Sequence, residues 1–268
     1  MDLSKKVSVI MGIYNCESTL TEAVNSILNQ TYCNWELIMC DDGSKDSTYV
    51  LASNIKNEFP DKIILLKNDR NMGLNYTLNK CLNTATGDYI ARMDADDISL
   101  PTRFEKEVDF LNNNPEYSIV STSMICFDEN GDWGKSATDE KPHCKDIVKG
   151  TPFCHAPCMV RIEAYKDVEG YSVDKKLLRV EDYHLWVKMY EKGYKGYNIQ
   201  EPLYKMRDDR NATNRRTFNN RLNEAYVKTL AIKKLHLPIW NYIYVLRPII
   251  IGLLPTTIYE FLHKKSMK

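Results

Sequence analysis

Short apolar runs alternate with longer polar and amphipathic segments along the first 127 residues. Apolar runs of about four to eight residues predict buried strands, and amphipathic segments of about a dozen residues predict helices. Strands that alternate with helices are typical of an α/β fold with a mostly parallel sheet and helices on both faces. The predicted strands cover residues 7–13, 36–40, 63–67, 89–93, 117–127 and 154–160, and the predicted helices cover residues 19–28, 47–59, 74–85, 101–113 and 181–192.

Local signals mark where several helices begin and end. Thr19 and Glu22 have the spacing of a capping box at the start of the first helix, and Gly193 is a stop signal for the helix before it. Residues 129–150 are polar and show no clear periodicity. Residues 207–221 carry five arginines and predict a loop that leads into a long helix ending near residue 234.

The bulk composition excludes several classes of protein. A chain of 268 residues can bury a substantial core in one or two domains. Its 36 basic and 36 acidic residues balance, so no basic field indicates a nucleic-acid partner. The first apolar segment is too short for a signal peptide, so we expect a cytoplasmic protein. We therefore expect its eight cysteines to be reduced thiols.

One group of histidines and cysteines could supply ligands for a structural zinc ion. Their spacing matches no common zinc motif, which disfavours this alternative. The group comprises His143, Cys144, Cys154, His155 and Cys158.

Two acidic clusters come directly after predicted strands. Asp41 and Asp42 follow the second strand, and Asp94, Asp96 and Asp97 follow the fourth. The carboxyl ends of parallel strands share one edge of the sheet, where open α/β sheets bind ligands. Mg²⁺ and Mn²⁺ commonly bridge one or two carboxylates to substrate phosphates. The clusters therefore indicate a metal-assisted phosphate site, and a solvated acidic loop that caps the next helix is the alternative.

Five motifs occur in a characteristic order. They are Val9-Ile10-Met11-Gly12-Ile13-Tyr14-Asn15, Cys40-Asp41-Asp42-Gly43-Ser44, Asn71-Met72-Gly73, Asp94-Ala95-Asp96-Asp97 and Val180-Glu181-Asp182-Tyr183-His184-Leu185-Trp186. Together they resemble the motifs of the inverting family-2 glycosyltransferases with the GT-A fold, of the type that builds bacterial surface polysaccharides. The resemblance extends over roughly residues 7–210. Gly12 departs from the pattern, because the family often has proline there.

The resemblance implies a donor site for a nucleotide-sugar, expected to be a UDP-hexose. Tyr14 and Glu17 would hold the base and ribose, and Asp41 would accept a hydrogen bond from the uracil ring. Asp94 would reach the ribose, and Asp96 would ligate Mn²⁺ or Mg²⁺ together with the diphosphate. A turn with a helix cap is the alternative interpretation of the Asp-Asp-Gly-Ser segment.

The resemblance also implies the catalytic base. Asp182 aligns with the aspartate that deprotonates the acceptor, and Glu181 would orient the acceptor or support the base. Helix capping alone is the alternative for both acids. Gly73 is a further candidate on the donor side, as is Arg92, which would face the diphosphate or pair with an acid.

Two other candidates lie outside the main motifs. His155 matches a segment near the family's acceptor pocket, and a structural histidine is the alternative. Arg207 sits where family members place a basic residue in a flexible loop over the diphosphate, and a solvated basic loop is the alternative.

The implied activity is hexose transfer from a UDP-sugar to a glycan or a polyprenyl-diphosphate-linked acceptor. A sugar nucleotidyltransferase is one competing prediction, but residues 12–15 lack the glycine-rich phosphate loop that such enzymes need. A catalytically silent carbohydrate-binding protein is another. The acids at 41, 94, 96 and 182 argue against it.

The expected domain organisation follows the motifs. Residues 1–210 would form the catalytic domain, with a nucleotide-sugar half at 1–127 and an acceptor half at 128–210. Residues 211–268 would form a helical C-terminal region.

The end of this region, residues 237–268, combines aromatic and apolar residues with flanking lysines. Its apolar runs are far shorter than the roughly 20 residues needed to span a bilayer. Pro248 and Pro255 are expected to break the helix. We expect monotopic attachment to the inner face of the cytoplasmic membrane. A helical pair packed on the catalytic domain or in a homodimer is the alternative.

Overall fold

The computed structural model describes residues 4–136, 138–208 and 217–253, and its strands form one nine-stranded sheet. The strands are β1 (Val7–Ile13), β2 (Trp35–Asp41), β3 (Ile63–Lys67), β4 (Tyr89–Arg92), β5 (Ile98–Ser99), β6 (Ile119–Asp128), β7 (Gly131–Lys135), β8 (Met159–Arg161) and β9 (Gly196–Arg207). Their order is β3-β2-β1-β4-β8-β6-β9-β5, and β7 pairs with β6. β3, β2, β1 and β4 run parallel, as do β6 and β9, and the antiparallel β8 joins the two blocks. The prediction of a mostly parallel sheet is confirmed.

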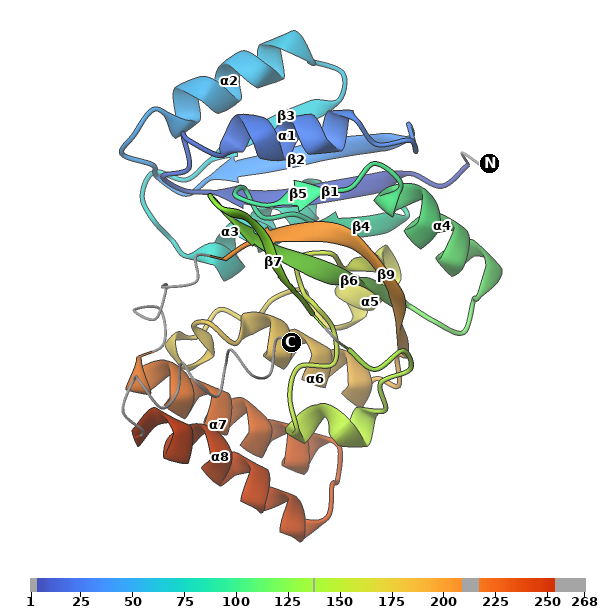
Figure 1. Cartoon of the computed structure of the whole chain (residues 1–268), viewed down its shortest axis with the longest axis vertical. Helices are drawn as coiled ribbons and strands as arrows, with labels where there is room; N and C mark the ends of the chain where they lie inside the picture. The colour runs from blue at the N-terminus through green and yellow to red at the C-terminus, as the bar shows by residue number, and fades with distance from the viewer. Residues whose placement is uncertain (1–3, 137, 209–216, 254–268) are drawn as a thin grey trace.

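Helices cover both faces of this sheet, as predicted (Figure 1). The α-helices are α1 (Leu20–Leu28), α2 (Thr48–Glu58), α3 (Leu74–Thr84), α4 (Arg103–Asn113), α5 (Ile162–Asp167), α6 (Glu181–Glu191), α7 (Phe218–Lys234) and α8 (Ile243–Leu253). Short 3-10 helices are η1 (Cys144–Val148), η2 (Lys175–Leu177) and η4 (Ile239–Tyr242). α1, α2 and α4 pack on one face, and α3, α5 and α6 pack on the other.

Alternate side chains of the central strands enter two different hydrophobic cores. Along β1, Val9 and Met11 pack with Val24 of α1, whereas Ile10 packs with Leu78 of α3. All of these side chains are fully or almost fully buried. A strand that is buried on both faces needs apolar residues at nearly every position, which explains why the sequence shows continuous apolar runs there.

The strand predicted at residues 154–160 is wrong over most of its length. Only Met159–Arg161 is extended, as β8. The backbone N–H of Cys158 donates to the carbonyl of His155, which closes a turn around Pro157. A proline has no N–H to donate to a sheet, so this apolar segment turns instead of pairing.

Two other local expectations need correction. Arg207 was expected in a loop, but it is the last residue of β9. Thr19 does not form a capping box with Glu22, because its hydroxyl donates to the carbonyls of Cys16 and Ala95. The carboxylate of Glu22 instead forms an ion pair of 2.7 Å with Arg207.

The C-terminal region forms a helical hairpin at the opposite end of the molecule from α2 (Figure 1). The buried Nζ of Lys228 in α7 donates to the carbonyl of Val148 in η1, which ties the hairpin to the rest of the chain. α8 continues through Pro248, contrary to the expected break, and it forgoes one helical hydrogen bond there. No described helix is both long and apolar enough to cross a bilayer. Pro255 lies outside the described residues.

Candidate active site

The parallel strands bring the predicted acidic residues to one edge of the sheet. Ile13 at the end of β1 lies beside Asp41 at the end of β2. Arg92 at the end of β4 pairs with Ile10, so the loop that carries Asp94 emerges at the same edge. The segments after all three strands therefore emerge at one edge of the sheet.

Asp42 organises the loop that follows β3. Its carboxylate accepts hydrogen bonds from the side-chain amide of Asn68 at 2.9 Å and from the backbone N–H groups of Met72 at 2.8 Å and Gly73 at 2.9 Å. Because both oxygens are used, Asp42 holds this loop in place. Sequence reasoning assigned Asp42 no such role, since its partners lie about 30 residues away along the chain.

The carboxylates of Asp41 and Glu17 both accept hydrogen bonds from nearby backbone N–H groups. Asp41 is fully buried, and its oxygens lie 3.3 and 3.4 Å from the backbone nitrogen of Ser44. Glu17 is exposed and accepts a hydrogen bond of 2.8 Å from Ser47, at the start of α2. Their expected contacts with the nucleotide remain predictions.

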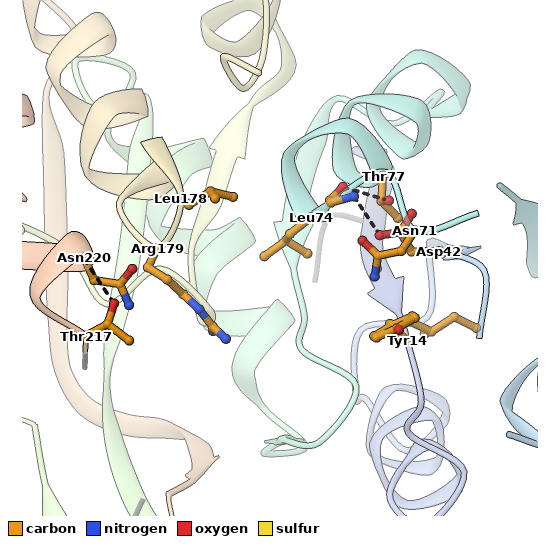
Figure 2. Close-up of a pocket in the computed structure, with 12 residues that line it drawn as sticks. Tyr14, Asp42, Asn71, Leu74, Thr77, Leu178, Arg179, Thr217 and Asn220 are labelled. Atoms are coloured by element: carbon orange, nitrogen blue, oxygen red, sulfur yellow. Dashed lines mark hydrogen bonds between the residues drawn. The ribbon is translucent and has the colours of Figure 1, made fainter. Parts of the chain in front are cut away.

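A cavity of about 630 Å³ opens beside the organised loop (Figure 2). Tyr14, Asp42 and Leu74 lie on one side of it, and Arg179 and Thr217 lie on the other. The full lining is Gly12, Ile13, Tyr14, Asp42, Asn71, Gly73, Leu74, Thr77, Leu178, Arg179, Thr217 and Asn220. The predicted donor residues Tyr14 and Gly73 therefore face the same space as Arg179, a residue that no sequence motif indicated.

Arg92 is buried beneath this edge and is paired with an acid. Its guanidinium lies 2.6 Å from the carboxylate of Asp94 and also donates to the carbonyl of Met93. Of the two alternatives for Arg92, the structure therefore shows the pairing with an acid.

The rest of the acidic loop is fixed by Arg207. The buried carboxylate of Asp97 accepts a 2.7 Å hydrogen bond from the backbone N–H of Arg207. The guanidinium of Arg207 donates to the carbonyl of Asp96 and lies 4.5 Å from the ring centre of Phe127. Burial, followed by the charges of Asp94 and Asp96, raises the pKa of Asp97 well above its usual range. Asp97 and Arg207 therefore support the loop that presents Asp96.

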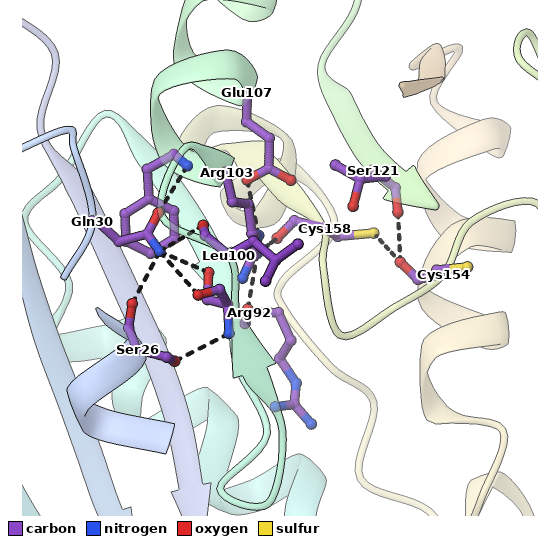
Figure 3. A network of polar contacts seen from close by, with 12 residues as sticks. Ser26, Gln30, Arg92, Leu100, Arg103, Glu107, Ser121, Cys154 and Cys158 are labelled. Atoms are coloured by element: carbon purple, nitrogen blue, oxygen red, sulfur yellow. Dashed lines mark hydrogen bonds and ion pairs between the residues drawn. The ribbon is translucent and has the colours of Figure 1, made fainter. Parts of the chain in front are cut away.

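A buried polar network lies behind the loop (Figure 3). The guanidinium of Arg103 forms an ion pair with Glu107 at 3.1 Å, and both side chains are fully buried. Arg103 also donates to the backbone carbonyls of Arg92 at 3.0 Å and Cys158 at 3.3 Å. Burial raises the pKa of Glu107 to about 8, in spite of the opposing Arg103 charge. Because these bonds reach the backbone, they fix where β4 ends.

Glu181 and Asp182 occupy the first turn of α6, near the Arg92–Asp94 pair. α6 is anchored by Trp186, whose buried ring packs edge-on against Phe153 at 5.2 Å. Burial, followed by the charge of Glu181, raises the pKa of Asp182 to about 7. Burial also raises the pKa of Glu181 above its usual value. The positive charge of Arg92 opposes the rise in both acids, so α6 and β4 are electrostatically connected. A carboxyl group with a pKa near neutrality is suited to accepting a proton.

His155 lies behind α6 with one ring nitrogen satisfied. Its Nε2 lies 3.2 Å from the hydroxyl of Tyr171, and its ring packs edge-on against Trp186. Its buried Nδ1 has no hydrogen-bond partner within the described residues. Burial, followed by the charge of Arg92, lowers the pKa of His155 well below its usual range. The histidine is therefore a neutral side chain, and its predicted role in acceptor binding remains untested.

The acids at this edge fit a divalent cation held jointly with a phosphate ligand. The described residues contain no group of three or more His, Cys, Asp or Glu side chains suited to a metal, and this includes the five-residue zinc candidate. Mg²⁺ and Mn²⁺ often take only one or two protein carboxylates and complete their shell with phosphate oxygens and water. Asp94 and Asp96 are partly exposed at this edge, and theirs are the carboxylates that would supply such ligands.

Known proteins resemble this chain along most of its length. Residues 8–168 match the model of the family described as Glycosyl transferase family 2. EpsE of Bacillus subtilis (strain 168), named as a glycosyltransferase, is 45% identical over 267 residues, covering 100% of this chain and 96% of that protein. An Escherichia coli UDP-Gal:alpha-D-GlcNAc-diphosphoundecaprenol beta-1,3-galactosyltransferase is 30% identical over 281 residues, covering 100% of this chain and 98% of that enzyme.

Two solved structures share the fold at low sequence identity. S. aureus TarS 1-349 in complex with UDP-GlcNAc has a TM-score of 0.70 and 18% identity, covering 92% of this chain and 71% of that chain. In another TarS crystal structure, this chain spans 43% of the TarS chain. The mannosyltransferase PcManGT from Pyrobaculum calidifontis, in complex with GDP-Man and Mn²⁺, has a TM-score of 0.62 and 20% identity. The match covers 99% of this chain and 70% of the PcManGT chain.

These likenesses confirm the GT-A fold. The family match covers more than half of the sequence and includes the motifs that end β1, β2 and β4. The chain therefore belongs to glycosyl transferase family 2.

Proposed function

We propose that this chain is an inverting, metal-dependent glycosyltransferase that moves a hexose from a UDP-sugar to a polyprenyl-diphosphate-linked glycan. The observation that carries the mechanism is the position of Asp182. Its carboxyl group is shielded at the start of α6, has a pKa near 7, and lies within the electrostatic reach of Arg92 on the donor side. The donor and acceptor printed in the name of the E. coli relative support this choice of substrates.

The proposed reaction is a direct displacement at the anomeric carbon. The acceptor hydroxyl oxygen forms the new bond to that carbon, and the bond from the carbon to the UDP oxygen breaks. UDP leaves with the bonding electron pair, and the acceptor proton passes to the carboxylate of Asp182. Glu181 would orient the acceptor beside it, and His155 would line the acceptor side.

The donor would lie along the edge formed by β1, β2 and β4. Tyr14, Glu17 and Asp41 would hold the nucleoside, with Gly73 lining the cavity and Asp94 close to the ribose. Asp96 would hold Mn²⁺ or Mg²⁺ together with the diphosphate. The cation would neutralise negative charge on the leaving group. The Mn²⁺ in the PcManGT complex supports this assignment.

A test of the mechanism compares two substitutions of the same kind. Asp182→Asn should retain UDP binding but lose transfer to a GlcNAc-diphosphate lipid by about a hundredfold or more. Asp61→Asn, at an exposed acid after α2, is the matched control and should transfer normally. Near-normal turnover of Asp182→Asn would reassign Asp182 to helix capping.

Donor hydrolysis tests the competing functions. UDP release from UDP-glucose, UDP-galactose or UDP-GlcNAc without acceptor argues for a live transferase and against a silent carbohydrate-binding protein. Synthesis of UDP-sugar from UTP and a sugar phosphate would instead indicate a nucleotidyltransferase.

We also propose that residues 1–210 form the catalytic unit and that residues 237–268, within the helical C-terminal region 211–268, attach it to the inner face of the cytoplasmic membrane. Exposed apolar side chains on η4 and α8 support attachment. Ile243, Leu246, Ile250 and Leu253 recur at helical spacing along α8, and the indole of Trp240 is exposed beside them. Such a stripe suits the headgroup boundary of a bilayer. Attachment there would bring the active site to a lipid-linked acceptor.

A further inference from the structure

A short turn before α6 presents Arg179 to the cavity. On either side of it, Leu177 and Val180 are buried in the core, whereas Leu178 and Arg179 are exposed. The side-chain amide of Asn223 in α7 donates to the carbonyl of Leu178 at 3.0 Å, which fixes the turn from the other side. The turn is therefore anchored at both ends while its middle residues face outward.

The backbone of Arg179 has an unusual conformation. Its φ is +66°, in the left-handed region that residues other than glycine, asparagine and aspartate seldom adopt. Such strain persists only where the surrounding structure enforces it. The conformation points the arginine side chain into the cavity, opposite Tyr14 and Asp42 (Figure 2).

Unlike Arg92 and Arg207, which form ion pairs at this edge, Arg179 is not paired with an acid in the described residues. Arg92 is paired with Asp94, and Arg207 is paired with Glu22. Within the described residues, the guanidinium of Arg179 makes no hydrogen bond or ion pair. Its charge is therefore available to a ligand in the cavity.

The chemistry of the cavity favours an anionic ligand at this point. An arginine guanidinium presents a planar fork of donors that matches phosphate oxygens. The acids on the edge of the sheet repel a diphosphate, so a ligand of that kind needs cationic donors beyond a single metal ion. The side chain of Leu178, 54% exposed, adds an apolar surface next to the guanidinium.

We propose that Arg179 binds the diphosphate group of an ester that enters the 630 Å³ cavity. The proposal rests on the proposed function, which supplies two such esters: the UDP-sugar donor and the lipid-diphosphate acceptor. Both esters present the same diphosphate group to the guanidinium, and separate measurements of donor affinity and acceptor preference distinguish them.

The test uses three variants of the full chain. Arg179→Asn removes the charge and keeps a residue that tolerates the left-handed backbone, so it should fold. Arg179→Lys keeps the charge without the fork. Lys176→Gln is the matched control, because Lys176 is exposed on the same segment but lies over the ring of Tyr226, outside the cavity lining.

Two measurements identify the source of the diphosphate. The first is the affinity for UDP with Mn²⁺ by calorimetry. The second is the ratio of kcat/KM for a GlcNAc-diphosphate lipid to that for an alkyl GlcNAc without the diphosphate. Arg179→Asn should reduce one of these by about 10- to 100-fold, Arg179→Lys should lose less, and Lys176→Gln should match wild type. A loss in the first assigns the donor, and a loss in the second assigns the acceptor.

Binding of inorganic pyrophosphate, measured by calorimetry, keeps the inference independent of turnover. If the wild-type chain transfers no sugar, the proposed function fails, but weaker pyrophosphate binding by Arg179→Asn still supports the assignment. Unchanged UDP affinity, acceptor ratio and pyrophosphate affinity in Arg179→Asn would overturn it.

Discussion

The ion pair between Arg92 and Asp94 is asymmetric. The two side chains lie 2.6 Å apart, but the arginine is 2% exposed and the aspartate is 38% exposed. Removing one partner therefore leaves either a buried cation or a solvated anion. The first is far more costly than the second.

This asymmetry predicts unequal losses of stability. Asp94→Ala should lower the free energy of unfolding by about 3 kcal/mol or more, because it leaves the Arg92 guanidinium buried without a counter-ion. Arg92→Met preserves much of the packing and leaves Asp94 in water, so it should cost less, about 1–2 kcal/mol. Urea denaturation of both variants provides the comparison. Equal losses would mean that solvent reaches Arg92 more easily than its burial indicates.

The pKa of Asp182 predicts how activity and stability depend on pH. The general base must be ionised, so kcat/KM should rise with pH through about 7. A folded-state pKa raised above the unfolded value gives a stabilising contribution that is complete below about pH 4 and is lost as the pH rises through about 7. Asp182→Asn should therefore be more stable than wild type at pH 8, with little difference at pH 4. Thermal melts at both pH values test this, and a constant difference would refute it.

Asp96 and Asp97 are neighbours with different expected roles. Asp97 is buried, its raised pKa favours the neutral form, and its carboxyl group accepts hydrogen bonds from the Arg207 backbone and the Tyr204 hydroxyl. An asparagine can do the same, so Asp97→Asn should keep Mn²⁺-dependent UDP affinity within about threefold. Asp96→Asn should lose about tenfold or more, because a neutral amide is a poor ligand for a hard cation. Full activity in EDTA would remove the metal from the mechanism.

Two glycines with positive φ predict different costs for the same substitution. At Gly43, φ is +73° and an added Cβ would lie 2.7 Å from the backbone of Arg70. At Gly73, φ is +91° and no atom lies within 4 Å of an added Cβ. Gly73→Ala should cost about 1 kcal/mol from backbone strain alone, and Gly43→Ala should cost at least twice that. Chemical denaturation gives both values, and similar costs would show that the Arg70 segment moves easily.

Membrane attachment predicts a position-dependent effect of an added charge. Ile243, 68% exposed on α8, and Val50, 62% exposed on α2, are matched apolar surface residues. Ile243→Glu should weaken flotation with anionic liposomes, whereas Val50→Glu should float like wild type. If the wild-type protein fails to float at low salt and Ile243→Glu instead converts a dimer to a monomer in sedimentation, the stripe is a dimer contact.

The N-terminal part of the fold could be predicted because its central strands, β1 and β2, are buried on both faces. The apolar runs alone identify the strands at residues 7–13 and 36–40. β9 could not be recognised, because its sequence contains Pro202 and its register is set by pairing with residues 119–127. A buried central strand can be predicted from its own apolar residues. A polar strand such as β9 can be predicted only when the strand that pairs with it is known.

The site likewise has some residues that local sequence indicates and others that only the folded structure reveals. The acidic motifs indicated Asp94 and Asp96 as candidates from their residue types and their place after a strand. Asp182 became a candidate only through the family resemblance, and the roles of all three remain predictions. No local pattern indicated that Asp42 binds the backbone at Gly73, or that the turn at Arg179 lies across the cavity from Tyr14. Both depend on segments that meet only in the folded chain.

The topology also has a consequence for synthesis on the ribosome. The block β3-β2-β1-β4 is complete once Arg92 has emerged, so it can assemble early. β6 ends at Asp128, but β9, which covers one of its edges, ends only at Arg207. At about 5–20 residues per second, that edge waits on the order of ten seconds for its partner. A nascent chain stalled in this interval would present an open strand edge, so we expect aggregation during synthesis to begin at β6.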